Sequence, residues 1–190
     1  MYTDLRSYQQ TLIISDFTVE FVKRFIPSTS RTRDQMEQAA RSGKQNIAEA
    51  TSASKQKPKN EPFLLSVASA SLKELLEDYK DFLRQHYLPL WAKDDQRALR
   101  VRALPYKSHT SYKTYISYLS SPEDACNVMI CLINQTTYLI DQQIKAVEKQ
   151  QRERGVVFES RNQRAARVLA AAEKREKEID AIIAKVLDKK

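Results

Sequence analysis

Apolar residues recur every three or four positions over four long stretches of the chain, which is the spacing of one face of an α-helix. These stretches predict helices at residues 4–26, 32–56, 61–86 and 121–150. The first and the last of these helices each carry two adjoining apolar stripes, whereas a single neighbouring helix can cover only one stripe. We therefore expect the last of them to use one stripe for the core and the other for a subunit interface.

The residues at the helix ends support these boundaries. Pro27 ends the first helix, and Pro62 suits the first turn of the third. Ser121 is the predicted cap of the helix that follows it. The second helix has a seam of mostly small residues, in which Gly43 is predicted to allow close packing against a neighbour.

Two regions lack a strong apolar pattern. Residues 87–120 are predicted to be irregular, with a short helix at 94–103 and a loop rich in tyrosine, serine and lysine after it. After Gly155 the apolar stripe is thin, which predicts a loosely attached helical extension. The chain is thus predicted to be all-α, with an antiparallel up-down four-helix bundle at 1–150 and a helical suffix at 151–190.

Composition agrees with this fold class, since the chain has only two glycines and six prolines. Its net charge of +8 favours polyanionic partners such as RNA, DNA or an acidic protein face. The start of the chain lacks the layout of a signal peptide, and no apolar run is long enough to span a membrane. Cys126 and Cys131 would point to different faces of one helix. We expect a cytoplasmic protein with reduced thiols.

The residue patterns of catalytic sites are missing from the sequence. His86 and His109 have no metal-binding spacing around them, and two isolated glycines cannot form a phosphate loop. Four acids on the third helix lack the Glu-x-x-His pairs of a di-metal bundle, so they predict a solvated face or a docking surface: Glu74, Glu77, Asp78 and Asp81. Glu49 is the one acid that the pattern places in a buried position. We expect no catalytic centre, no metal and no cofactor.

Basic residues gather in two places. The first set lies on the second helix and the turn after it, and consists of Arg41, Lys44, Lys55, Lys57 and Lys59. The second set lies in the region between the third and fourth long helices, and consists of Lys93, Arg97, Arg100, Arg102, Lys107 and Lys113. Tyrosines are threaded through the second set, among them Tyr112 and Tyr115. Cations among aromatic rings suit a single-stranded nucleic acid, whereas the alternative is that the rings only pack this region onto the helices.

Two segments also resemble a bacterial family. They are Gln38–Ala50, with Asn46-Ile47-Ala48-Glu49 at its centre, and Ala70–Tyr79 on the third helix. They are similar to the small four-helix-bundle proteins encoded in intervening sequences of rRNA genes, and to the accessory variability-determinant proteins of diversity-generating retroelements. The connection at 90–95 and the tail beyond Val147 look like a longer subgroup of this family. The resemblance implies a ring-like homopentamer with a basic surface, and in retroelement members binding to nucleic acid and to a reverse transcriptase.

The sequence therefore predicts a non-enzymatic, basic, oligomeric protein that binds RNA or DNA with little sequence specificity. It could assist a reverse transcriptase or another nucleic-acid enzyme. The alternative is a protein-interaction scaffold that docks an acidic partner through its basic ring or its suffix helix.

Overall fold

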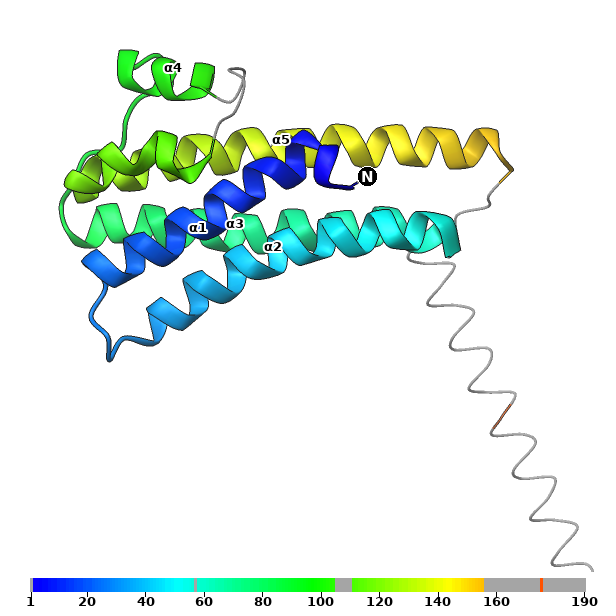
Figure 1. Cartoon of the computed structure of the whole chain (residues 1–190), viewed down its shortest axis with the longest axis horizontal. Helices are drawn as coiled ribbons and strands as arrows, with labels where there is room; N and C mark the ends of the chain where they lie inside the picture. The colour runs from blue at the N-terminus through cyan, green and yellow to red at the C-terminus, as the bar shows by residue number, and fades with distance from the viewer. Residues whose placement is uncertain (1, 57, 105–110, 156–174, 176–190) are drawn as a thin grey trace, which may run out of the picture. The chain divides into compact units, whose positions relative to one another are not determined.

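A computed structural model describes residues 2–56, 58–104, 111–155 and 175. The chain divides into two compact units, Met1–Gln151 and Arg152–Lys190. In the first unit, every element of the described residues is a helix (Figure 1). The prediction of an all-α protein is confirmed.

Within the described residues of this unit, four long helices and four short ones follow each other. In order they are η1 (Tyr2–Asp4), α1 (Arg6–Phe25), α2 (Arg31–Gln56), η2 (Pro58–Asn60), α3 (Glu61–Gln85), α4 (Gln96–Ala103), η4 (Tyr112–Ser120) and α5 (Pro122–Glu153), where η marks a 3₁₀ helix. The bounds of the long helices agree with the predicted ones to within three residues. Pro62 lies in the first turn of α3, and the Ser121 hydroxyl accepts a hydrogen bond from the Asp124 amide at 3.3 Å, as expected of a cap.

The long helices lie alongside one another (Figure 1) and bury one apolar core. Its centre holds an aromatic group in which the Phe21 ring lies 4.9 Å from Tyr79 and 5.1 Å from Phe82. The buried Tyr79 hydroxyl is 2.9 Å from the Thr18 hydroxyl, so this polar group is satisfied inside the core. The α1 and α3 helices are joined at this point by both ring packing and a hydrogen bond.

Gly43 lies where α2 approaches α3 closely. A Cβ atom at this position would meet the Leu72 side chain at 2.9 Å, which is shorter than a normal carbon–carbon contact. The prediction of a packing glycine is therefore confirmed. Ser42 and Ser71 also meet across this contact, with 2.9 Å between their hydroxyl oxygens.

The prediction that one stripe of α5 serves a subunit interface is wrong for most of that stripe. Val128 and Leu132 belong to the second stripe, and both are fully buried within a single chain. The segment between α3 and α5, which we call the insertion, folds back over this helix, and the Gln135 amide donates a hydrogen bond to the Arg102 carbonyl at 2.9 Å. Most of the second stripe therefore lies in the chain's own core.

The insertion is more regular than predicted. The short helix α4 is confirmed, with the Asp95 carboxylate as its cap at 2.8 Å from the Arg97 amide. The segment Tyr112–Ser120, which was predicted to be a loop, is a 3₁₀ helix packed against α1. A 3₁₀ helix has three residues per turn, so Tyr112, Tyr115 and Tyr118 lie on one face. That three-residue spacing was the signal in the sequence that could have predicted it.

Candidate nucleic-acid interface

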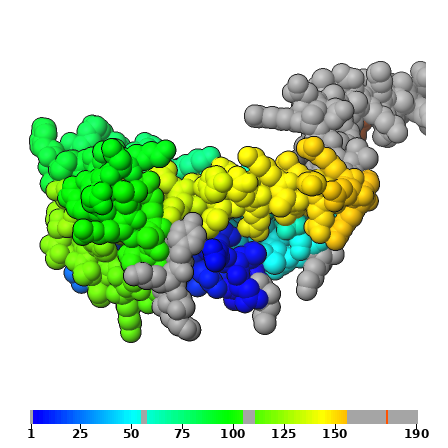
Figure 2. Space-filling model, turned by 90° about the horizontal axis from the view of Figure 1, so that it is seen from above, coloured from blue at the N-terminus to red at the C-terminus, as the bar shows by residue number. Residues whose placement is uncertain are grey.

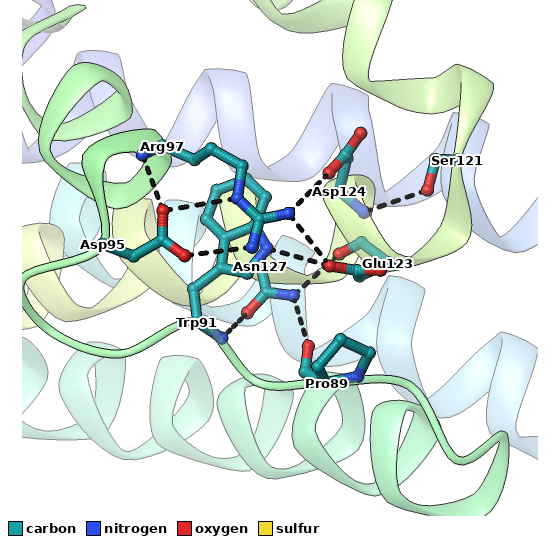
Figure 3. A network of polar contacts seen from close by, with 8 residues as sticks. All are labelled: Pro89, Trp91, Asp95, Arg97, Ser121, Glu123, Asp124 and Asn127. Atoms are coloured by element: carbon teal, nitrogen blue, oxygen red, sulfur yellow. Dashed lines mark hydrogen bonds and ion pairs between the residues drawn. The ribbon is translucent and has the colours of Figure 1, made fainter.

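A buried amide side chain ties the insertion to α5 at three backbone groups. The Asn127 side chain is 1% exposed and reaches the segment that leads into α4 (Figure 3). Its oxygen accepts a hydrogen bond from the Trp91 amide at 2.8 Å, and its nitrogen donates to the Pro89 and Glu123 carbonyls at 2.9 Å each. This arrangement holds the backbone of the connection in place. The role of Asn127 was not predicted from the sequence, because its partners lie up to 38 residues away.

Arg97 is the centre of an ionic network on the same side of α5 (Figure 3). Its guanidinium pairs with Asp95 at 3.0 Å and with Glu123 at 3.1 Å. It also lies 4.5 Å from the centroid of the Trp91 ring, and the hydrogen bonds from Arg97 lower the pKa of Asp95. Arg97 was predicted to bind nucleic acid. In the structure it stabilises the insertion, and its charge is already matched by acids.

Arg102 is likewise used inside the fold. Its side chain is half-buried and donates to the Ala98 carbonyl at 3.1 Å and to the Lys93 carbonyl. These bonds link Arg102 to one carbonyl within α4 and to another in the segment that leads into it. Only the guanidinium N–H groups of Arg102 that make no bond within the chain are left for the predicted binding of a nucleic acid.

The other predicted cations face solvent. Arg41, Lys59, Lys93, Arg100 and Lys113 are exposed, and Lys44 is half-buried. Among the residues that the structure describes, none of these six forms an ion pair with a carboxylate. Lys55 lies in α2, whereas Lys57 and Lys107 lie outside the described residues. The six can pair with an external anion, and we call them the free cations.

The free cations form two separate groups. Figure 1 places α4 at the opposite end of the unit from the last turns of α2, and Figure 2 shows the same separation from above. Lys93, Arg100 and Lys113 belong to the insertion, and Lys59 lies in η2, directly after α2. The two basic sets of the sequence are thus not brought together within one chain.

The three tyrosines of η4 are packing residues. Tyr115 was predicted to stack on a base, and this is wrong, because its ring is fully buried in the core. Burial also raises the pKa of Tyr115 to about 12. Tyr112 and Tyr118 are half-buried against the same core. The reason is the 3₁₀ helix, which turns the shared face of all three rings inward.

A pocket of about 630 Å³ lies between the insertion, α5 and the neighbouring turns of α1 and α3. Leu90, Trp91, Ile130 and Leu139 give it a mainly apolar lining. The Gln135 side-chain oxygen, which belongs to the same lining, is buried without a hydrogen-bond partner. An unsatisfied buried acceptor costs about 1–3 kcal/mol. This pocket was not predicted from the sequence.

The acids of α3 form an exposed stripe. Lys80 pairs with Glu77 at 2.7 Å, and Arg84 pairs with Asp81 at 2.9 Å. Asp78 is half-buried, and its pKa is raised to about 6, first by burial and then by the charges of Asp81 and Glu74. The Glu49 side chain, which was predicted to be buried, is exposed because it points away from the α2 seam.

The described side chains that could take part in catalysis or bind a metal do not gather at one place. Both cysteines are free, and burial raises the pKa of Cys126 strongly and that of Cys131 as well. The His86 ring stacks on Phe82 with 4.1 Å between centroids, whereas His109 lies outside the described residues. Over residues 2–56, 58–104 and 111–155, no three His, Cys, Asp or Glu side chains converge on a possible metal position.

Comparison with known proteins finds no matching protein family, no matching curated protein and no matching solved structure. The resemblance to the bacterial bundle family therefore stays a prediction. In the described part of the chain, no helix combines the length and the apolar character that crossing a membrane requires.

Proposed function

We propose that this protein binds RNA or DNA through its surface charge, with little sequence specificity and without catalysing a reaction. The observation that supports the proposal best is how few of its predicted binding cations form ion pairs within the described residues. Six of them, on α2, η2 and the insertion, have no carboxylate partner among the described residues, whereas Arg97 in the insertion is matched by acids. Free cations release counterions when they meet phosphates, and this release favours binding.

The remaining positive charge supports the same function. Residues 1–151 carry 21 Lys and Arg against 17 Asp and Glu, and residues 152–190 carry 11 against 7. Each unit thus contributes half of the net charge of +8. With Tyr115 buried and Tyr112 half-buried, phosphate contacts dominate at the free cations, which explains the expected tolerance of sequence.

We infer further that the four long helices form an antiparallel up-down bundle and that copies of it assemble into a ring, with a pentamer as the expected size. The charge distribution supports such an assembly. An acidic stripe on α3 and free cations on α2 give one copy two unlike surfaces, and unlike surfaces join head to tail. Repetition around a ring multiplies each modest group of cations, which strengthens polyanion binding.

A role beside a reverse transcriptase or another nucleic-acid enzyme belongs to this proposal through the family resemblance alone. The competing proposal is a scaffold that uses the same free cations to dock an acidic protein. Both demand an anionic partner, so the nature of that partner decides between them.

Fluorescence anisotropy with labelled RNA and DNA separates the two. The proposal predicts tight binding of both nucleic acids at ~50 mM salt and a steep loss by ~200 mM. Light scattering after gel filtration gives the subunit number in the same buffers. Absence of binding to either nucleic acid at low salt would leave the scaffold as the better explanation, and a monomer at micromolar concentration would remove the ring.

A further inference from the structure

The pocket between the insertion and α5 has a chemical character of its own. Its volume of about 630 Å³ is in the range of sites that hold a small organic molecule. Its lining contains four basic residues and no acidic one, the basic residues being Arg6, Lys80, Lys93 and Arg102. We propose that this pocket binds one nucleotide, with the base inside the apolar part and the phosphate at the basic rim.

Gln135 indicates that the ligand carries an N–H or O–H group. Its side-chain nitrogen donates to the Arg102 carbonyl at 2.9 Å, which fixes the orientation of the amide. The oxygen at the other end is buried in the pocket lining without a partner. A base offers amino or imino hydrogens to such an acceptor. A fatty acid, which would suit the apolar and basic parts equally well, has no donor to place there.

The basic rim indicates a negative charge on the ligand. Lys93 is exposed and has no carboxylate partner among the described residues, so a phosphate can pair with it directly. Lys80 already pairs with Glu77 at 2.7 Å, so it contributes less. The rim therefore places the anionic end of a ligand on the side of the insertion.

Tyr138 indicates a flat ligand. Its ring belongs to the pocket lining and is 63% exposed, so a ligand can reach the face of the ring. Stacking on such a ring suits every base, because each base has a π-face. Tyr138 thus supplies the stacking that the buried Tyr115 cannot.

The nucleotide has two possible sources, a free nucleotide or one unstacked residue of a bound strand. The second source rests on the proposed function, and the first does not. Both share the chemistry of a base joined to a phosphate, so one set of variants tests both.

Protection of Cys131 from alkylation is a direct measure of occupancy. The Cys131 thiol lines the pocket, whereas Cys126 is fully buried and reports any general opening of the fold. The four nucleoside monophosphates are added to the full-length protein, and alkylation by iodoacetamide at each cysteine is followed by mass spectrometry. The fluorescence of Trp91, the chain's one tryptophan and part of the same lining, gives a second readout.

We expect at least one monophosphate to protect Cys131, while its nucleoside without phosphate protects it less. Gln135→Leu and Tyr138→Ala each weaken this protection by about tenfold. Lys145→Ala, an exposed cation of α5 outside the pocket, leaves it unchanged. Tyr138→Ala removes an exposed side chain, so it keeps the test valid if Gln135→Leu disturbs the fold. Protection by dodecanoate but by none of the monophosphates, or protection in both pocket variants as strong as in the wild type, would overturn the proposal.

Single strands of equal length with and without bases distinguish the sources. If the pocket takes a residue of the strand, the strand with bases binds more tightly, and the pocket variants abolish this difference. If it takes a free nucleotide, the two strands bind equally and only the monophosphates protect Cys131. Failure of all strands to bind while monophosphates still protect would refute the proposed function and leave the pocket assignment standing.

Discussion

At the scale of single residues, the roles of similar side chains are decided by their neighbours. Arg97 and Arg100 lie one turn apart on α4, but Arg97 pairs with Asp95 and Glu123 and stacks on Trp91, whereas Arg100 is exposed without a described carboxylate partner. Asp95 lies two residues before Arg97, but Glu123 lies 26 residues away, so the local sequence shows only part of this network. The sequence could predict a basic helix here but not which of its cations is free.

Asn127→Ala tests how the insertion is held. The substitution leaves the Trp91 amide without its partner in a buried position and removes the donor to the Pro89 carbonyl. We expect a loss of about 3 kcal/mol in the free energy of unfolding, measured with urea.

The matched control is Asn134→Ala, on the same helix. The Asn134 side chain is exposed and bonds only to the Ile130 carbonyl of its own helix, at 2.8 Å, so its loss should change stability by no more than about 0.5 kcal/mol. Equal effects of the two substitutions would show that the amide of Asn127 does not hold the insertion.

At the scale of the elements, the periodic patterns were a good guide to the long helices and a poor one to the insertion. Helix periodicity, together with Pro27, Pro62 and Ser121, is local information, and the observed bounds follow it. The insertion depends on contacts between distant residues, such as the bond from the Gln135 amide to the Arg102 carbonyl. The pocket arises from these contacts, so it could not be read from the sequence.

The acidic stripe of α3 gives a prediction about pH. The pKa of Asp78 is about 6 in the folded chain, above the ordinary aspartate value of 3.8, so the folded state retains a proton that the unfolded state releases. The contribution of Asp78 to stability is therefore greatest below about pH 4 and is lost as the pH rises to 6 and above.

Asp78→Asn should accordingly stabilise the protein at pH 7 by about 1 kcal/mol, a value reduced from the pKa shift because the side chain is partly solvated. The gain should vanish near pH 4, and urea unfolding at the two pH values measures it. Asp16→Asn, at an exposed position of α1, is the control and should change little. A gain of the same size at both pH values would contradict the assigned cause.

At the scale of the whole molecule, the surface has clear regions of positive and negative charge, whereas it has less apolar surface than the sequence predicted. The α5 stripe that was expected to join subunits is buried within the chain, so apolar surface is a weaker driving force for assembly than the sequence predicted. The surface carries an acidic stripe on α3 and the free cations of α2, η2 and the insertion. The proposed function therefore depends on those cations meeting an anion.

The slope of nucleic-acid affinity against salt concentration tests this dependence most directly. A variant with Lys93→Ala, Arg100→Ala and Lys113→Ala removes the free cations of the insertion, and a variant with Lys23→Ala, Lys73→Ala and Lys145→Ala removes the same charge from other exposed positions. We predict a slope lower by about one for each phosphate that the first variant no longer neutralises, and a nearly wild-type slope in the second. Equal slopes in both variants and the wild type would contradict the proposal that the free cations bind the nucleic acid.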